Sequence, residues 1–172
     1  FNIINAASMI TQIIKINPLA VEQDKIKAVV EVLQKGGVSV YPTDTFYGIG
    51  VSCFSEKAVE KVYRLKKRKR FKPIPVLVSG PDMVKDIAVD IPSLFWKLVS
   101  KFWPGPLTIV LKASAKLPKS LLGPRRTIGV RRPALLWLEK LLEQASFPIT
   151  ATSANISGDK EIADAEKVKD IF

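Results

Sequence analysis

The alternation of helical and extended patterns along the chain is the feature that most limits its fold. Apolar residues recur at helical spacing at 18–35, after Ser55, at 94–102 and at 133–144. Runs that favour strands lie between these segments, at 38–41, 74–78, 107–111, 128–131 and 148–152. Such alternation predicts an α/β fold in which helices cover a sheet, and it leaves the pairing order of the strands open.

Length and composition place the chain among single-domain globular proteins. Its 172 residues can bury a full hydrophobic core, and 47% hydrophobic and 25% charged residues lie in the globular range. No apolar run approaches the roughly 20 residues that a membrane-spanning helix requires. Cys53 is the only cysteine and no signal-peptide pattern is found, so the sequence predicts a cytoplasmic protein without membrane partners.

Eight of the twelve residues at 61–72 are Lys or Arg, and none is acidic. A solvated helix face usually mixes both signs of charge, because opposite charges four residues apart stabilise a helix. An acid-free segment therefore favours binding of an external anion, in a chain whose net charge is +11. Composition alone leaves two other interpretations open, an exposed solubilising stretch and a nonspecific RNA-binding patch.

A second acid-free region covers residues 91–138 and contains several Lys and Arg between 112 and 132. Within it, Arg131 ends the predicted strand at 128–131. A guanidinium in that place can bind a carboxylate or phosphate through two parallel hydrogen bonds. An ordinary surface arginine at a strand end is the alternative interpretation.

The segment at 150–158 follows a predicted strand and is rich in small polar residues. Ser153 and Asn155 are two residues apart, so in extended geometry their side chains point to the same side and can bind one ligand. A turn or a helix-capping segment uses the same residue types, and this interpretation stays open.

Several common catalytic and nucleotide-binding patterns are absent from the sequence. The chain has no histidine, which excludes Ser-His-Asp and Cys-His mechanisms and the usual zinc sites, so Cys53 is interpreted as a small buried residue. Neither GxxxxGKS/T nor a complete GxGxxG occurs, so side chains must hold any nucleotide. What remains is charge neutralisation and positioning, as in transfers at phosphorus, where Mg²⁺ often assists. No protein side chain is predicted as a metal ligand.

Four segments, in order, resemble the YrdC family of L-threonylcarbamoyladenylate synthases over about residues 38–158. They are 41–48 (YPTDTFYG), 66–73 (KKRKRFKP), 103–108 (WPGPLT) and 128–131 (IGVR) leading to 153–155 (SAN). The resemblance implies a three-layer α/β fold with a twisted mixed sheet and a basic concave face. It also implies that L-threonine, bicarbonate and ATP are combined into threonylcarbamoyl-AMP and pyrophosphate, for threonylcarbamoyladenosine modification of tRNA by further proteins that accept the adenylate.

The same resemblance assigns roles to individual residues. The family's KxR signature falls on Lys66 and Arg68, which are implied to be catalytic, and its SxN signature falls on Ser153 and Asn155. Mg²⁺ would accompany ATP as its cofactor. ATP binding is implied for Lys66, Arg68, Lys72, Thr127, Ser153 and Asn155, and threonine binding for Thr45 and Arg131.

The chain also departs from the family pattern, and two rival functions remain. Ala151 stands where many relatives carry a serine that would contact threonine. We expect a single YrdC-like domain over residues 1–172, without the C-terminal segment that closes over the site in typical relatives. An RNA-binding module would use the same basic face without catalysis. A related carbamoyl-handling domain, as in the hydrogenase-maturation carbamoyltransferase HypF, would act on a different acceptor.

Overall fold

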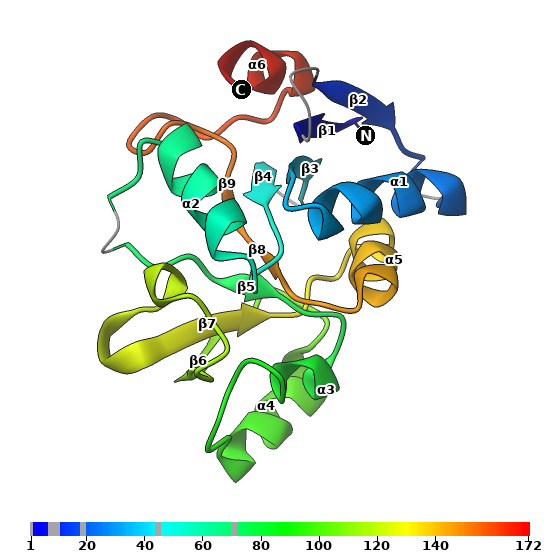
Figure 1. The fold of residues 1–172 in the computed structure, drawn as a ribbon. Coiled ribbons are helices and arrows are strands. Elements are labelled where there is room, and N and C mark those ends of the chain that lie inside the picture. The colour runs from blue at the N-terminus through cyan, green and yellow to red at the C-terminus, as the bar shows by residue number, and fades with distance from the viewer. Residues whose placement is uncertain (1, 7–10, 18–19, 44–45, 70–71) are drawn as a thin grey trace.

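The computed structural model describes residues 2–6, 11–17, 20–43, 46–69 and 72–172. Helices and strands alternate along most of this chain (Figure 1). The helices are α1 (Gln23–Gln34), α2 (Glu56–Leu65), α3 (Pro81–Val84), α4 (Ser93–Phe102), α5 (Leu136–Ala145) and α6 (Ala165–Ile171). The strands are β1 (Asn2–Ala6), β2 (Gln12–Lys15), β3 (Val38–Pro42), β4 (Tyr47–Gly50), β5 (Val76–Leu77), β6 (Ile109–Lys112), β7 (Thr127–Arg131), β8 (Ile149–Thr150) and β9 (Thr152–Ser153).

The described strands form two sheets. The five-stranded sheet has the order β2-β1-β3-β4-β9 and is antiparallel throughout. The four-stranded sheet has the order β6-β7-β5-β8, and it is mixed because β5 runs parallel to β7 and antiparallel to β8. A bridge between Ser52 and Ile149 joins the two sheets. The mixed α/β architecture is therefore as predicted, although only the smaller sheet is mixed.

Strand β3 is buried on both faces, and this places helices on both sides of the larger sheet. Val38 and Val40 pack in one hydrophobic cluster with the inner face of α2. Tyr41 points the other way, into a second cluster built by α1 and α5, where its ring centroid lies 6.0 Å from that of Trp137. Successive residues of a strand face opposite sides, so this alternation produces a three-layer arrangement (Figure 1).

Two helix ends follow the predicted local chemistry. Helix α2 begins after Ser55, whose Oγ accepts a hydrogen bond from the backbone N of Ala58 at 3.3 Å. Helix α1 stops at Gln34, and Gly36 has the left-handed φ of +72° that favours glycine after a helix. The predicted helix starts are too early, because α1 begins at Gln23 and α5 at Leu136.

Two strand predictions need correction. The predicted strand at 148–152 is two short strands, because β8 pairs with β5 whereas β9 pairs with β4. Between them the backbone N of Ala151 bonds to the carbonyl of Pro75 at 2.8 Å. The second correction concerns β4, which was not predicted and which includes Tyr47 and Gly48 of the segment 41–48. Strands β1 and β2 and helices α3 and α6 were not predicted.

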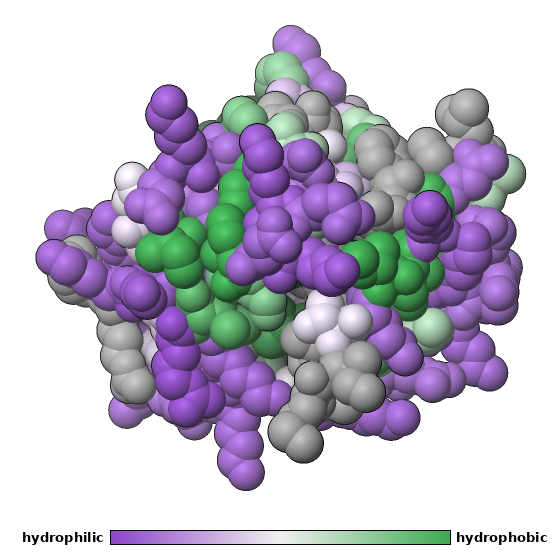
Figure 2. Space-filling view, turned by 90° about the horizontal axis from the view of Figure 1, so that it is seen from above, coloured by the Kyte–Doolittle hydropathy of each residue, from purple (hydrophilic) through white to green (hydrophobic). Residues whose placement is uncertain are grey.

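The surface seen from above is dominated by hydrophilic residues, which surround separate hydrophobic patches (Figure 2). Among the described helices, none has the length and apolar composition needed to cross a membrane. The elements that meet near the end of α2, β4 and β9 position the candidate site.

Candidate active site

Lys66 lies directly after α2 and is almost completely buried, with 1% of its surface exposed. Its ammonium donates hydrogen bonds to the carbonyl of Ser153, to the carbonyl of Asn155 at 2.8 Å and to Oδ1 of Asn155 at 2.9 Å. A lysine ammonium has three donors, so these bonds use all of them. The structure thus joins the predicted KxR and SxN motifs through a single buried cation.

The loop at 153–157 is held by further bonds around Lys66. Oγ of Ser153 lies 2.7 Å from Oδ1 of Asn155, and Nδ2 of Asn155 donates to the carbonyl of Asp159 at 2.7 Å. The backbone N of Ser157 donates to the carbonyl of Lys66 at 2.8 Å. Ser153 and Asn155 do turn toward each other, as their spacing predicts, and the loop is fixed to the end of α2 from both directions.

Burial lowers the pKa of Lys66 to about 8, since the charged form loses its hydration. The positive charge of Arg68 acts in the same direction, whereas the negative charge of Glu161 opposes it. The three oxygen acceptors around the ammonium also favour the charged form. Lys66 is therefore a cation that the protein holds close to its titration range.

Arg68 and Lys72 occupy a more open environment than Lys66. The chain reverses at Lys67, whose φ is +48°, and this turn carries Arg68 away from the helix axis. The Arg68 guanidinium is half-buried and donates to the carbonyls of Lys72 at 3.2 Å and Pro73 at 2.9 Å. The Lys72 side chain is exposed, and its carbonyl also accepts from the hydroxyl of Tyr63 at 2.8 Å. The Arg68 side chain therefore lies against the backbone of Lys72.

Thr127 lies beside this basic pair, in a separate hollow of about 350 Å³. Its Oγ1 donates to the carbonyl of Pro124 at 2.9 Å. None of the described residues that line the hollow is charged, and prolines form much of its wall. The lining residues are Pro73, Pro75, Thr108, Val110, Gly123, Pro124, Thr127 and Gly129. Pro73 connects the hollow to the basic pair, because its carbonyl is the acceptor for Arg68.

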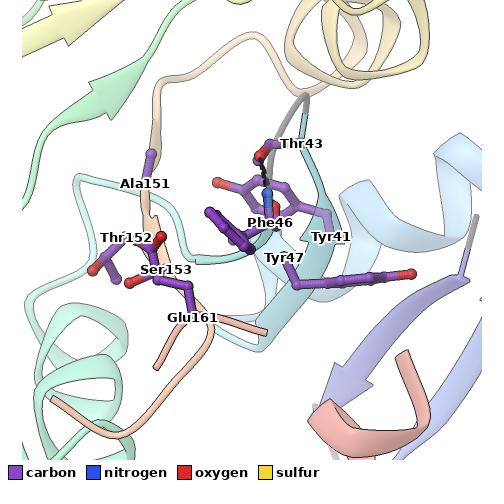
Figure 3. Close-up of a pocket in the computed structure, with 9 residues that line it drawn as sticks. Tyr41, Thr43, Phe46, Tyr47, Ala151, Thr152, Ser153 and Glu161 are labelled. Carbon is purple, nitrogen blue, oxygen red and sulfur yellow. Dashed lines mark hydrogen bonds between the residues drawn. The ribbon is translucent and has the colours of Figure 1, made fainter. Parts of the chain in front are cut away.

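Ser153 lines a second, smaller pocket of about 170 Å³ (Figure 3). Its aromatic lining residues are Tyr41 of β3, Tyr47 of β4 and Phe46, which directly precedes β4. The hydroxyl of Thr43 donates to the carbonyl of Phe46 at 2.6 Å. Gly48 belongs to the wall because a Cβ there would meet the ring of Tyr41 at 2.9 Å. The lining residues are Tyr41, Thr43, Phe46, Tyr47, Gly48, Ala151, Thr152, Ser153 and Glu161.

Of the two predicted threonine-binding residues, only Arg131 lies among the residues that the structure describes. Thr45 lies outside the described residues. Arg131 is half-buried at the end of β7, where its Nε donates to the carbonyl of Gly105 at 3.0 Å, and it lines neither hollow described above. Its contact with Gly105 nevertheless links two of the four recognised segments, 103–108 and 128–131.

Glu161 is the site residue that the sequence reasoning missed. It lines the smaller pocket, yet it belongs to the chain that follows the SxN motif. The excess of positive charge in the sequence gives no reason to assign an acidic residue such as Glu161 to the site. No group of three or more His, Cys, Asp and Glu that could hold a metal ion occurs among the described residues.

Known proteins resemble this chain in both sequence and fold. The family profile Sua5_yciO_yrdC, described as Telomere recombination, matches residues 31–172. The chain is 34% identical to the threonylcarbamoyl-AMP synthase of Pyrococcus abyssi, over 88% of this chain and 45% of that protein. It is 36% identical to a putative threonylcarbamoyl-AMP synthase of Methanocaldococcus jannaschii, over 91% of this chain and 74% of that protein.

A solved structure gives the same result in three dimensions. The fold matches that of Pyrococcus abyssi Sua5 complexed with L-threonine, with a TM-score of 0.83 and 34% identity. The match covers 88% of this chain and 44% of that one. The chain thus spans about half the length of the Pyrococcus protein, and the similarity extends over most of the residues described above.

Proposed function

The chain belongs to the Sua5/YciO/YrdC family, and from this premise we propose that it forms threonylcarbamoyl-AMP from L-threonine, bicarbonate and ATP, with release of pyrophosphate. The observation that carries the proposal is the junction of Lys66 with Ser153 and Asn155, which assembles both signature motifs in one place. The Sua5 structure with bound L-threonine supports an amino acid as one substrate.

The proposed chemistry has two bond-forming steps. The amine of threonine attacks the carbon of bicarbonate, with loss of water, or of CO₂, with loss of a proton, to give a carbamate. A carbamate oxygen then attacks the α-phosphorus of ATP as pyrophosphate leaves. Negative charge accumulates on phosphate oxygens during the second step. Donors that already face that position lower the barrier, because they need no reorganisation when the charge develops.

Arg68 and Lys72 are the residues best placed for this charge neutralisation. Both lie at the open edge of the site, and Arg68 is held in place by two backbone carbonyls. Lys66 would act indirectly by positioning the loop at 153–155, because its ammonium donates all of its hydrogen bonds to that loop. Mg²⁺ would be bound mainly by phosphate oxygens and water, in keeping with its preference for such ligands.

The two hollows would divide the substrates between them. The wall of prolines beside Thr127 suits the flat, weakly polar face of a purine base, and it adjoins Lys72 and Arg68. The smaller pocket beside Ser153 has the dimensions of a small molecule and would receive threonine. In this arrangement ATP would contact Thr127, and the family resemblance also implies ATP binding by Ser153 and Asn155.

The proposal places the chain in tRNA modification in the cytoplasm, with its product passed to proteins that transfer the threonylcarbamoyl group to tRNA. An RNA-binding module without catalysis is not favoured, because the curated relatives are named as synthases. A domain that carbamoylates another acceptor would give the same fold, so the acceptor has to be tested directly.

Pyrophosphate release tests the proposal. The purified chain with Mg²⁺ and ATP should release pyrophosphate only when both L-threonine and bicarbonate are present. Omission of either substrate is the internal control, and L-serine and L-valine test the acceptor. Release that does not depend on threonine would rule out the assignment, and release that depends on a different acceptor would favour the related carbamoyl-handling class.

A further inference from the structure

The pocket beside Ser153 has an unusual lining for a protein with a net charge of +11. Among the described residues that line it, Glu161 is the only charged one, and no Lys or Arg takes part. The ring of Phe46 points toward Ala151 and Ser153, whereas the ring of Tyr47 points away from them (Figure 3); Tyr41 and Tyr47 also contribute atoms to the wall. A carboxylate together with aromatic rings attracts cations, since the ring faces carry partial negative charge. The pocket chemistry therefore suits a ligand with a positive group.

Glu161 has acceptor capacity available for such a group. Its side chain is exposed, and none of the described residues donates a hydrogen bond to it. Glu161 also interacts with Lys66 through its charge, which raises the pKa of that lysine. The three donors of Lys66 are already directed at Ser153 and Asn155, so the lysine leaves the carboxylate oxygens unbonded.

We propose that Glu161 binds the α-ammonium group of the amino-acid substrate and thereby selects an amino acid over the corresponding hydroxy acid. This inference rests on the proposed function, and it adds a residue that neither signature motif contains. The aromatic walls and Ala151 would contact the apolar part of the ligand. The carboxylate would supply the charged contact that fixes which end of the ligand enters the pocket.

The expected contribution is modest because Glu161 is exposed in the free protein. Ion pairs at the surface are screened by water, and one that a ligand only partly covers changes affinity by about fivefold. The preference for an ammonium group should weaken at high salt for the same reason. A much larger effect would require a fully desolvated pair, which the open pocket does not provide.

The test compares L-threonine with 2,3-dihydroxybutanoate, in which a hydroxyl replaces the amino group. Binding is measured by calorimetry without ATP for the wild-type chain, Glu161→Gln and Asp159→Asn. Asp159→Asn is the matched control, because it removes the same charge two residues away and leaves intact the Asp159 carbonyl that accepts from Asn155. Circular dichroism of each variant verifies that the fold is unchanged.

The wild-type chain and Asp159→Asn should bind threonine about fivefold more tightly than the hydroxy acid, and Glu161→Gln should bind both alike. A Glu161→Gln variant that keeps the preference overturns the inference, as does a wild-type chain without one. Pyrophosphate release separates the two proposals. Threonine-dependent release without the binding preference removes only the Glu161 assignment, whereas the preference without such release leaves the ammonium site and removes the synthase.

Discussion

The end of α2 and the basic segment that follows it carry the same kind of charge in different surroundings. Lys66 is buried and gives all three of its donors to the loop at 153–155. Arg68, two residues later, is half-buried and donates only to backbone carbonyls of its own segment, and Lys72 is exposed. One short sequence therefore supplies a buried anchor and, a few residues later, two more accessible basic side chains.

This difference teaches that charge density does not reveal which cation touches a ligand. A buried ammonium is retained only if its hydrogen bonds replace the lost hydration, so Lys66 is committed to protein oxygens. An exposed or half-exposed cation keeps part of its hydration and can exchange it for a phosphate. We therefore treat Lys66 as the residue that positions the loop, and Arg68 and Lys72 as those that meet the substrate.

Lys66→Met should have the largest effect, because it removes the anchor and takes one donor away from each of three oxygen acceptors. We expect pyrophosphate release to fall at least about 100-fold, the cost of displacing catalytic groups by about 1 Å. The free energy of unfolding should fall by about 1 to 3 kcal/mol, as for buried polar groups that lose their partner. Urea unfolding and steady-state kinetics on the same preparation measure both quantities.

Lys67→Met is the matched control for this variant. It removes the same charge from the neighbouring position, where the lysine is exposed, and it should leave both stability and rate nearly unchanged. If Lys66→Met lost activity at full stability, Lys66 would act on the substrate itself, and the contrast between the two regions would disappear.

Arg68→Ala should have an intermediate effect and should separate activity from stability. Its guanidinium bonds to carbonyls at the surface, so we expect less than about 1 kcal/mol of destabilisation. The rate should fall about tenfold, which corresponds to about 1.4 kcal/mol of transition-state stabilisation. Arg64→Ala, an exposed arginine in the last turn of α2, is the control. Equal rates for both variants would place the anion site elsewhere.

The sequence predicted the fold class and the main helices because hydrophobic periodicity reports which face of an element is buried. It could not predict that β8 and β9 belong to different sheets, since this depends on partners at Leu77 and Gly48 that are distant in the chain. Helix starts were misplaced for a similar reason. The periodicity reports buried positions, and those of α1 begin at Ile26, well after the predicted start.

The site was predicted in part. The motif resemblance selected Lys66, Ser153 and Asn155, and the structure brings these three together. The sequence could not predict that the Lys66 side chain points inward, because its burial follows from the packing of α2 against the rest of the core. Glu161 was missed since a single acid in a polar loop has no distinctive pattern, and only the pocket reveals its place.

The smallest expected effect is a pH dependence of stability that Lys66 has and Arg68 cannot have, since a guanidinium does not titrate in this range. Burial and the charge of Arg68 lower the pKa of Lys66 from 10.5 to about 8, with Glu161 opposing the change. Between these values the unfolded chain holds a proton that the folded chain has released, so stability rises with pH. The cost of the buried charge is complete below pH 8 and vanishes above 10.5.

The free energy of unfolding of the wild-type chain, relative to Lys66→Met, should therefore increase by about 1 kcal/mol between pH 7 and pH 9. The comparison cancels other groups that titrate nearby, such as Cys53 and Tyr63, whose pKa values burial raises in both proteins. Arg68→Ala should reduce the increase, because it removes one cause of the lowered pKa. A difference that is flat with pH would mean that the hydrogen bonds to Ser153 and Asn155 fully offset the burial of the ammonium, and that Lys66 is as permanently charged as Arg68.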